Sequence, residues 1–165
     1  MEGVQPIRNT IFMHFRNHFK ATRVGWPDVG NLHFKTLTFQ DRGRLVKPFS
    51  VDEVKAAVWD CDSFKSPGPD GVNFGFIKEL WHVLRDDLMR FVSEFHRNGK
   101  LARGISSTFI ALIPKVDSPQ KLHDFRPIFL VGSLYKILAT VLANRLRVVV
   151  GKVVSEIQTT FVKDR

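Results

Sequence analysis

The sequence predicts a mostly helical α+β fold that contains one β-hairpin. Along most of the chain, apolar residues recur every three or four positions, as they do on one face of a helix. One region differs, because residues 108–114 and 125–131 are two runs of β-branched and aromatic residues with a polar turn between them. With 165 residues, the chain is long enough for one domain with a substantial core.

The first part of the chain predicts two helices that are separated by a stretch with little periodicity. Residues 6–20 place aromatic and aliphatic side chains on one stripe, which is typical of an amphipathic helix. Residues 24–44 contain glycines and adjacent charges, and they predict a loop. Ser50 and Glu53 have the spacing of a capping box, so we expect a second helix from there to about residue 61.

Residues 73–97 predict one long helix with a wide, largely buried apolar stripe, and Gly99 follows as a left-handed C-cap. Before this helix, residues 65–71 read Lys-Ser-Pro-Gly-Pro-Asp-Gly. Two prolines and two glycines in seven residues impose a rigid loop. Two interpretations stay open: an ordinary turn between helices, or a loop that presents Lys65, Ser66 and backbone amides to a phosphate.

The hairpin and the helix after it carry exposed positive charge. Lys115 and Arg126 lie close to the hairpin tip, where a mobile ammonium and a bidentate guanidinium would suit a phosphate clamp. Spacing alone favours the other interpretation, two solvated surface charges, because basic hairpin tips are common. The helix predicted over residues 132–150 places Lys136 and Arg145 off its apolar stripe, which predicts a basic face for contacts with a nucleic-acid backbone.

Composition narrows the class of partner. The net charge is +9, and residues 99–165 carry 11 basic and 4 acidic residues against 14 and 12 in residues 1–98. A basic half favours a polyanion, with nucleic acid ahead of an acidic membrane. Cys61 is the only cysteine, which excludes a disulfide within the chain and a paired-cysteine zinc site. No apolar run approaches the roughly 18 residues of a membrane span, and we expect no signal peptide.

Five segments appear in a fixed order: SPGPDG, FIALIPK, DFRPIFL, YKILATVLANRL and SEIQTTFVKDR. Together they resemble the amino-terminal part of the reverse transcriptase of plant LINE-type (non-LTR) retrotransposons. The resemblance implies an incomplete right-hand polymerase fold in which the hairpin belongs to the fingers. Residues 48–165 would be a partial reverse transcriptase domain, comprising the fingers and the start of the palm. Residues 1–47 would be a linker-like upstream region.

The resemblance also implies roles for single residues. Lys115 and Arg126 match fingers positions that contact the phosphates of the incoming dNTP. RNA template and DNA primer would be the partners, in the cytoplasm or nucleus and not at a membrane. The positions expected to contact nucleic acid are Lys65, Ser66, Lys136, Arg145 and Gln158.

The same resemblance predicts that the chain is inactive by itself. Polymerases of this family hold Mg²⁺ with palm carboxylates. Those motifs are absent here, so we expect no catalytic residue and no metal bound by this fragment. Phe129, Ile157 and Asp164 stand where the family commonly has Ser, Asn and a small residue, which is consistent with relaxed constraint. Two alternatives remain open: a stand-alone basic RNA-binding module without catalysis, and a helical interaction protein with incidental charge.

Overall fold

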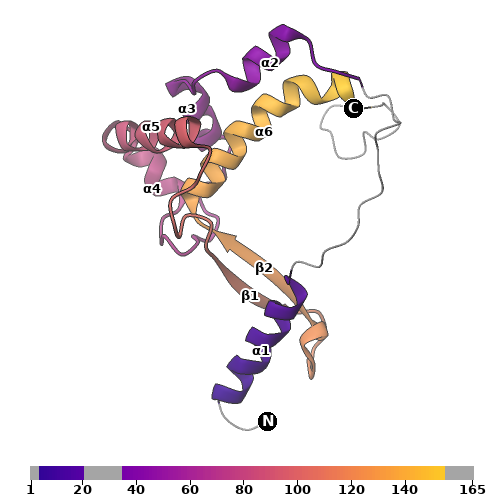
Figure 1. The fold of residues 1–165 in the computed structure, drawn as a ribbon. Helices are drawn as coiled ribbons and strands as arrows, with labels where there is room; N and C mark the ends of the chain where they lie inside the picture. The colour runs from indigo at the N-terminus through magenta and orange to yellow at the C-terminus, as the bar shows by residue number, and fades with distance from the viewer. Residues whose placement is uncertain (1–3, 21–34, 155–165) are drawn as a thin grey trace. The chain divides into compact units, whose positions relative to one another are not determined.

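The computed structural model describes residues 4–20 and 35–154, and within them it contains helices and one antiparallel hairpin (Figure 1). This arrangement confirms the α+β expectation. In chain order the elements are α1 (Val4–His18), α2 (Phe39–Val46), α3 (Val51–Trp59), α4 (Phe74–Glu79), α5 (Trp81–Asn98), β1 (Thr108–Pro114), the 3-10 turn η1 (Leu122–Asp124), β2 (Phe125–Val131) and α6 (Ser133–Val153).

The chain divides into two compact units. The first comprises residues 1–33 and 113–126, and it therefore holds α1 and the turn end of the hairpin. The second comprises residues 34–112 and 127–165. It holds α2 to α6 together with the opposite ends of both strands.

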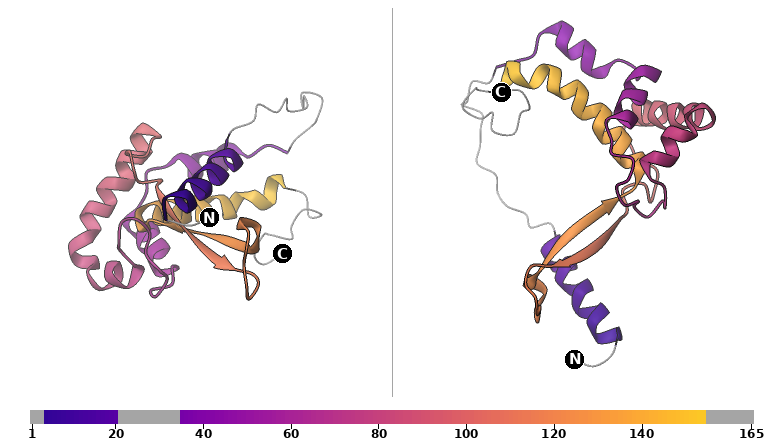
Figure 2. Two further views of the ribbon diagram at one scale, coloured as in Figure 1. Left: turned by 90° about the horizontal axis from the view of Figure 1, so that it is seen from below. Right: turned by 180° about the vertical axis from the view of Figure 1, so that it is seen from behind.

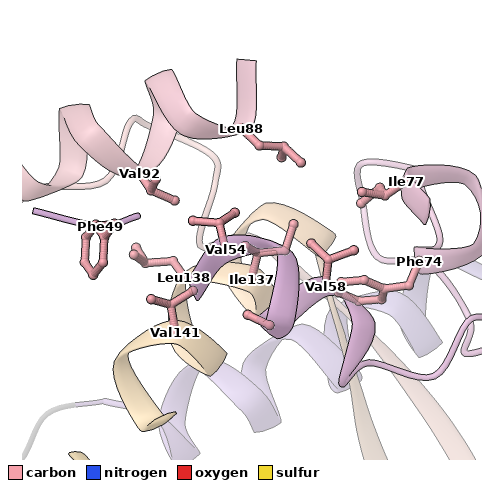
Figure 3. Packing of buried hydrophobic residues seen from close by; sticks show 11 residues of the cluster. Phe49, Val54, Val58, Phe74, Ile77, Leu88, Val92, Ile137, Leu138 and Val141 are labelled. Carbon is pink, nitrogen blue, oxygen red and sulfur yellow. The ribbon is translucent and has the colours of Figure 1, made fainter. Parts of the chain in front are cut away.

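The core of the second unit is built around α3, which contacts α4, α5 and α6. Figure 3 shows Val54 and Val58 of α3 between side chains from the other three helices. Both valines are fully buried, as are Val92 of α5 and Ile137 of α6. Burial of such branched side chains is the main stabilising contribution. The remaining buried members of this cluster are Phe49, Ala57, Phe74, Ile77, Leu88, Leu138 and Val141.

Several local predictions are confirmed by the backbone. The Ser50 hydroxyl accepts a hydrogen bond from the Glu53 amide at 3.2 Å, and a Glu53 carboxylate oxygen accepts one from the Ser50 amide at 2.9 Å. Gly99 ends α5 in the left-handed region with φ of 63°. Both strands have the predicted bounds.

The long helix predicted over residues 73–97 is in fact two helices. The backbone of Leu80 leaves the helical region with φ of −96° and ψ of 23°, so α4 ends and α5 begins there. The buried residues of both helices, Phe74 and Ile77 of α4 and Leu88 and Val92 of α5, belong to one hydrophobic core. Trp81, immediately after the break, packs its ring edge-on against Trp59 of α3 at 5.5 Å.

The loop predicted over residues 24–44 is contradicted in its last part by α2. Thr38 begins this helix, because its hydroxyl accepts from the Asp41 amide at 3.1 Å and donates to the Asp41 carboxylate at 2.7 Å. The buried Asp41 also accepts from the Lys152 ammonium at 2.6 Å. This ion pair joins α2 to the C-terminal end of α6, and the two helices run side by side in Figure 2.

The loop of residues 65–71 is anchored to the start of α6. Gly68 lies so close to the junction of β2 and α6 that a methyl group there would be 2.4 Å from the Val131 carbonyl carbon. Asp70 accepts from the Ser133 amide at 2.5 Å and from its hydroxyl at 2.7 Å. Burial raises the pKa of Asp70, but these bonds outweigh it and hold the pKa below its ordinary value. Asp70 thus caps α6 across 63 residues of sequence.

Helix α6 is longer than predicted. It begins at Ser133 and continues through Gly151 to Val153, whereas the sequence predicted an end near residue 150. Neither α6 nor any other helix in residues 4–20 and 35–154 is both long enough and apolar enough to cross a bilayer.

Candidate nucleic-acid interface

The turn end of the hairpin carries both of the predicted phosphate-binding cations, Lys115 and Arg126. The Lys115 amide donates to the Asp124 carbonyl at 2.8 Å, which pairs these two residues across the strands. Lys115 directly follows the last residue of β1, and Arg126 is the second residue of β2, so both cations lie near the turn. A shared face for the two side chains stays a prediction.

Both cations are exposed, but they differ in their contacts. The Lys115 ammonium donates to the His123 carbonyl at 3.0 Å, which holds it over the turn. The Arg126 guanidinium has no hydrogen bond or ion pair with any residue in the described ranges 4–20 and 35–154. A guanidinium in that state retains all of its donors for an anionic ligand.

Asp124 organises the turn between the strands. One of its carboxylate oxygens accepts from the amides of Gln120 and Lys121 at 2.9 and 2.8 Å. These backbone bonds are the main reason that the pKa of Asp124 lies below its ordinary value, with smaller contributions from the charges of His123 and Lys115. The carboxylate thus stays ionised near neutral pH and continues to accept these turn amides.

In the second unit, Lys65 and Lys136 lie on one groove. The groove has a volume of about 320 Å³, and Tyr135 also lines it. Asp60 and Asp62 also line it, so its charge is balanced and not strongly positive. Ser66 is exposed beside Lys65. The structure therefore brings together two of the predicted lysines, from segments that are about 70 residues apart.

The prediction that Arg145 lies on the solvated face of its helix is contradicted. Arg145 is only 8% exposed, and its guanidinium forms a bidentate pair with Glu53 at 2.9 and 3.0 Å. Its remaining donors reach backbone carbonyls of the segment before α3, at 2.6 to 3.1 Å. Arg145 therefore joins α6 to the segment that precedes α3, and its donors are already used. The carbonyls belong to Leu45, Lys47 and Pro48.

This pair predicts acid sensitivity of the fold. The hydrogen bonds from Arg145 lower the pKa of Glu53 from 4.5 to about 2. Because the folded-state pKa is depressed, the stabilisation is present above pH 4.5 and is lost as the pH falls from about 4.5 towards 2. Urea unfolding across this pH range should show the loss, at most about 3 kcal/mol. A Glu53→Gln variant is the control, because it should lose less stability over the same range; equal losses would contradict the assignment.

Two cations that the sequence analysis left unassigned also face a pocket. Arg44 and Lys47 lie at and just after the end of α2, and with α3 and α6 they enclose a volume of about 370 Å³. They were missed because residues 24–44 were interpreted as a loop. The sequence did contain a sign of helix α2. Thr38 is followed three residues later by Asp41, and this spacing is typical of the start of a helix.

Gln158, one of the predicted nucleic-acid contacts, lies outside the described ranges 4–20 and 35–154. Magnesium does not fit the donor set within those ranges, because they hold no group of three or more His, Cys, Asp or Glu residues suited to a metal ion. The adjacent Asp86 and Asp87 lie on α5, where they pair with Arg85 and Arg90.

Comparison with known proteins gives one informative relative. No protein-family model matches the chain. The whole chain aligns over 168 residues, with 30% identity, to a protein of Xenopus laevis named "Transposon TX1 uncharacterized 149 kDa protein". The chain spans 13% of the length of that relative. The similarity indicates a transposon-related origin.

Proposed function

We propose that this chain is the fingers and early-palm part of the reverse transcriptase of a non-LTR retrotransposon. It contributes contacts to the RNA template, the DNA primer and the dNTP phosphates, and it requires carboxylates from another part of the enzyme for Mg²⁺ and catalysis. The similarity to a much longer transposon protein supports the proposal that another part of the enzyme supplies the catalytic carboxylates. The plant source remains a prediction of the resemblance, since the relative is a frog protein.

The observation that carries the proposal is the pair of exposed cations, Lys115 and Arg126, at the turn end of the hairpin. The Lys115 ammonium donates a hydrogen bond to the His123 carbonyl. The Arg126 guanidinium makes no hydrogen bond or ion pair within the described residues. Both cations belong to the first unit, so their relation depends only on the local hairpin register. A guanidinium and an ammonium on one face bind adjacent phosphate oxygens with charge-assisted hydrogen bonds.

The groove lined by Lys65 and Lys136 is a second contact in the proposal. Its two lysines supply positive charge, and Tyr135 offers an aromatic side chain that is 39% exposed. Aromatic rings beside cations are typical of surfaces that bind single-stranded nucleic acid. Arg145 has no place in this surface, because Glu53 and backbone carbonyls occupy its guanidinium.

The proposal predicts that the double variant Lys115→Ala, Arg126→Ala binds a primed RNA template about tenfold or more weakly than the original chain. Each lost cation removes a charge-assisted contact with a phosphate. Fluorescence anisotropy with a labelled template measures the difference.

The matched control is the double variant Arg85→Ala, Arg90→Ala, which removes the same charge from α5. Those two arginines already pair with Asp86 and Asp87, so they attract phosphate less. We expect the control to bind within about threefold of the original chain. Equal weakening by both variants would show that only net charge matters and would contradict a hairpin site.

A further inference from the structure

The pocket beside α2 combines a positive rim with an apolar floor. Arg44 and Lys47 form the rim, and both side chains are exposed. Val141, Val148 and Val149 of α6 form its apolar lining, which we call the floor; Val141 and Val149 are buried, and Val148 is its exposed edge. The volume of about 370 Å³ falls within the range of about 300 to 1,000 Å³ that is usual for small-molecule sites.

The rim is positive because the other charges of the pocket are neutralised. Glu53 also lines it, but its carboxylate is bound by the buried guanidinium of Arg145. Asp41 of α2 does not line the pocket; it is paired with Lys152, and the charge of Arg44 makes a smaller contribution to its lowered pKa. By contrast, the Arg44 and Lys47 side chains make no hydrogen bond or ion pair with residues of the described part of the chain. The local excess charge is thus carried by these two side chains.

The position of the rim is fixed by the fold. Arg145 donates to the carbonyls of Leu45 and Lys47, so the backbone that carries both rim cations is held against α6. The same guanidinium stacks over the Phe49 ring at 4.2 Å. A pre-positioned rim reduces the ordering that a ligand would otherwise have to impose.

The floor distinguishes this pocket from a simple phosphate site. Val148 is 60% exposed although it lies among charged side chains, so it offers apolar surface to a ligand. Asn144 stands beside it and donates to Asp60 at 3.3 Å, which leaves its amide oxygen available to accept. A ligand with a flat apolar part, hydrogen-bond donors on its edge and an attached phosphate matches these features. An unpaired nucleotide has all three.

We infer that this pocket binds one unpaired nucleotide of an RNA strand, with its phosphate at Arg44 and Lys47 and its base on the floor around Val148. A base in a duplex is stacked and paired, so the pocket selects single-stranded RNA. The inference rests on the proposed function, because it takes RNA as the ligand. The site is separate from the hairpin cations and is tested independently of them.

The test is the variant Val148→Glu, which places a carboxylate on the floor and should repel the phosphate. Leu146→Glu is the matched control on the same helix, because Leu146 is 54% exposed and does not line the pocket. Two positions along a helix differ by about 200° around its axis, so the control carboxylate points elsewhere. Anisotropy with labelled single-stranded RNA and a blunt RNA duplex of equal length gives the readout.

We expect Val148→Glu to weaken single-stranded binding by about tenfold or more, and Leu146→Glu by less than about threefold. Duplex binding should change equally in both. Arg44→Gln with Lys47→Gln should reproduce the single-strand loss, and thermal melts should confirm that every variant is folded. Equal weakening by Val148→Glu and Leu146→Glu would overturn the inference about the pocket. The proposed function would survive that result if Lys115→Ala, Arg126→Ala binds the primed template more weakly than the original chain.

Two further outcomes separate the proposals. If the original chain binds neither RNA, both the inference and the proposed function are overturned. If Val148→Glu weakens binding while the Lys115, Arg126 variant does not, the pocket is supported and the hairpin site is rejected.

Discussion

Arg145→Met should destabilise the chain by about 3 to 5 kcal/mol. The substitution keeps much of the side-chain volume but leaves the Glu53 carboxylate without its bidentate partner. It also deprives three backbone carbonyls before α3 of a donor. An uncompensated buried charge and unpaired polar groups are among the most costly changes in a protein interior. Urea unfolding followed by circular dichroism measures the loss.

The control for this prediction is the double variant Arg145→Met, Glu53→Gln. Removing both charges avoids the unpaired carboxylate, so the double variant should be more stable than Arg145→Met alone. A single variant that loses less than about 1 kcal/mol would mean that Arg145 is a surface residue, as the sequence first predicted.

Gly68→Ala should destabilise the chain by about 2 to 4 kcal/mol. The added methyl group would lie 2.4 Å from the Val131 carbonyl carbon and 2.5 Å from the Gly132 nitrogen. Backbone atoms cannot rotate away, so the loop of residues 65–71 must move off the junction. That movement pulls Asp70 from Ser133 and removes the cap of α6. Thermal unfolding of both proteins at one pH measures the difference.

The matched control is Gly43→Ala in α2, where an added methyl group meets no atom within 4 Å. Alanine favours helix over glycine, so this change should be neutral or stabilising by up to about 1 kcal/mol. If both alanines had the same effect, the close approach at Gly68 would not be a constraint on the fold.

Features fixed by neighbouring residues could be predicted from the sequence. The Ser50–Glu53 capping box, the Gly99 C-cap and the bounds of both strands were all correct, because each depends on local backbone chemistry. The nearness of Lys115 and Arg126 to the hairpin turn was predictable for the same reason, because it follows from the bounds of the two strands. Helix α2 was missed although Thr38 and Asp41 mark its start, because glycine and adjacent charges pointed to a loop.

Features fixed by distant residues could not be predicted. The partners of Arg145 lie 92 to 100 residues earlier in the chain, and helical periodicity alone cannot reveal that a basic side chain turns inward. Likewise, the loop of residues 65–71 was expected to be a turn or a phosphate site, but its Asp70 caps a helix 63 residues away. The pocket of Arg44 and Lys47 could not be predicted either, because it includes the long-range pair of Arg145 and Glu53.

The most direct test of the proposed function is the salt dependence of binding to a primed RNA template. Each neutralised phosphate contributes about −0.7 to −0.9 to the slope of log K against log salt. We predict a steep negative slope for the original chain, and a slope that is shallower by about 1.5 for Lys115→Ala, Arg126→Ala. Identical slopes for the two proteins, or no binding at low salt, would contradict a phosphate-binding hairpin.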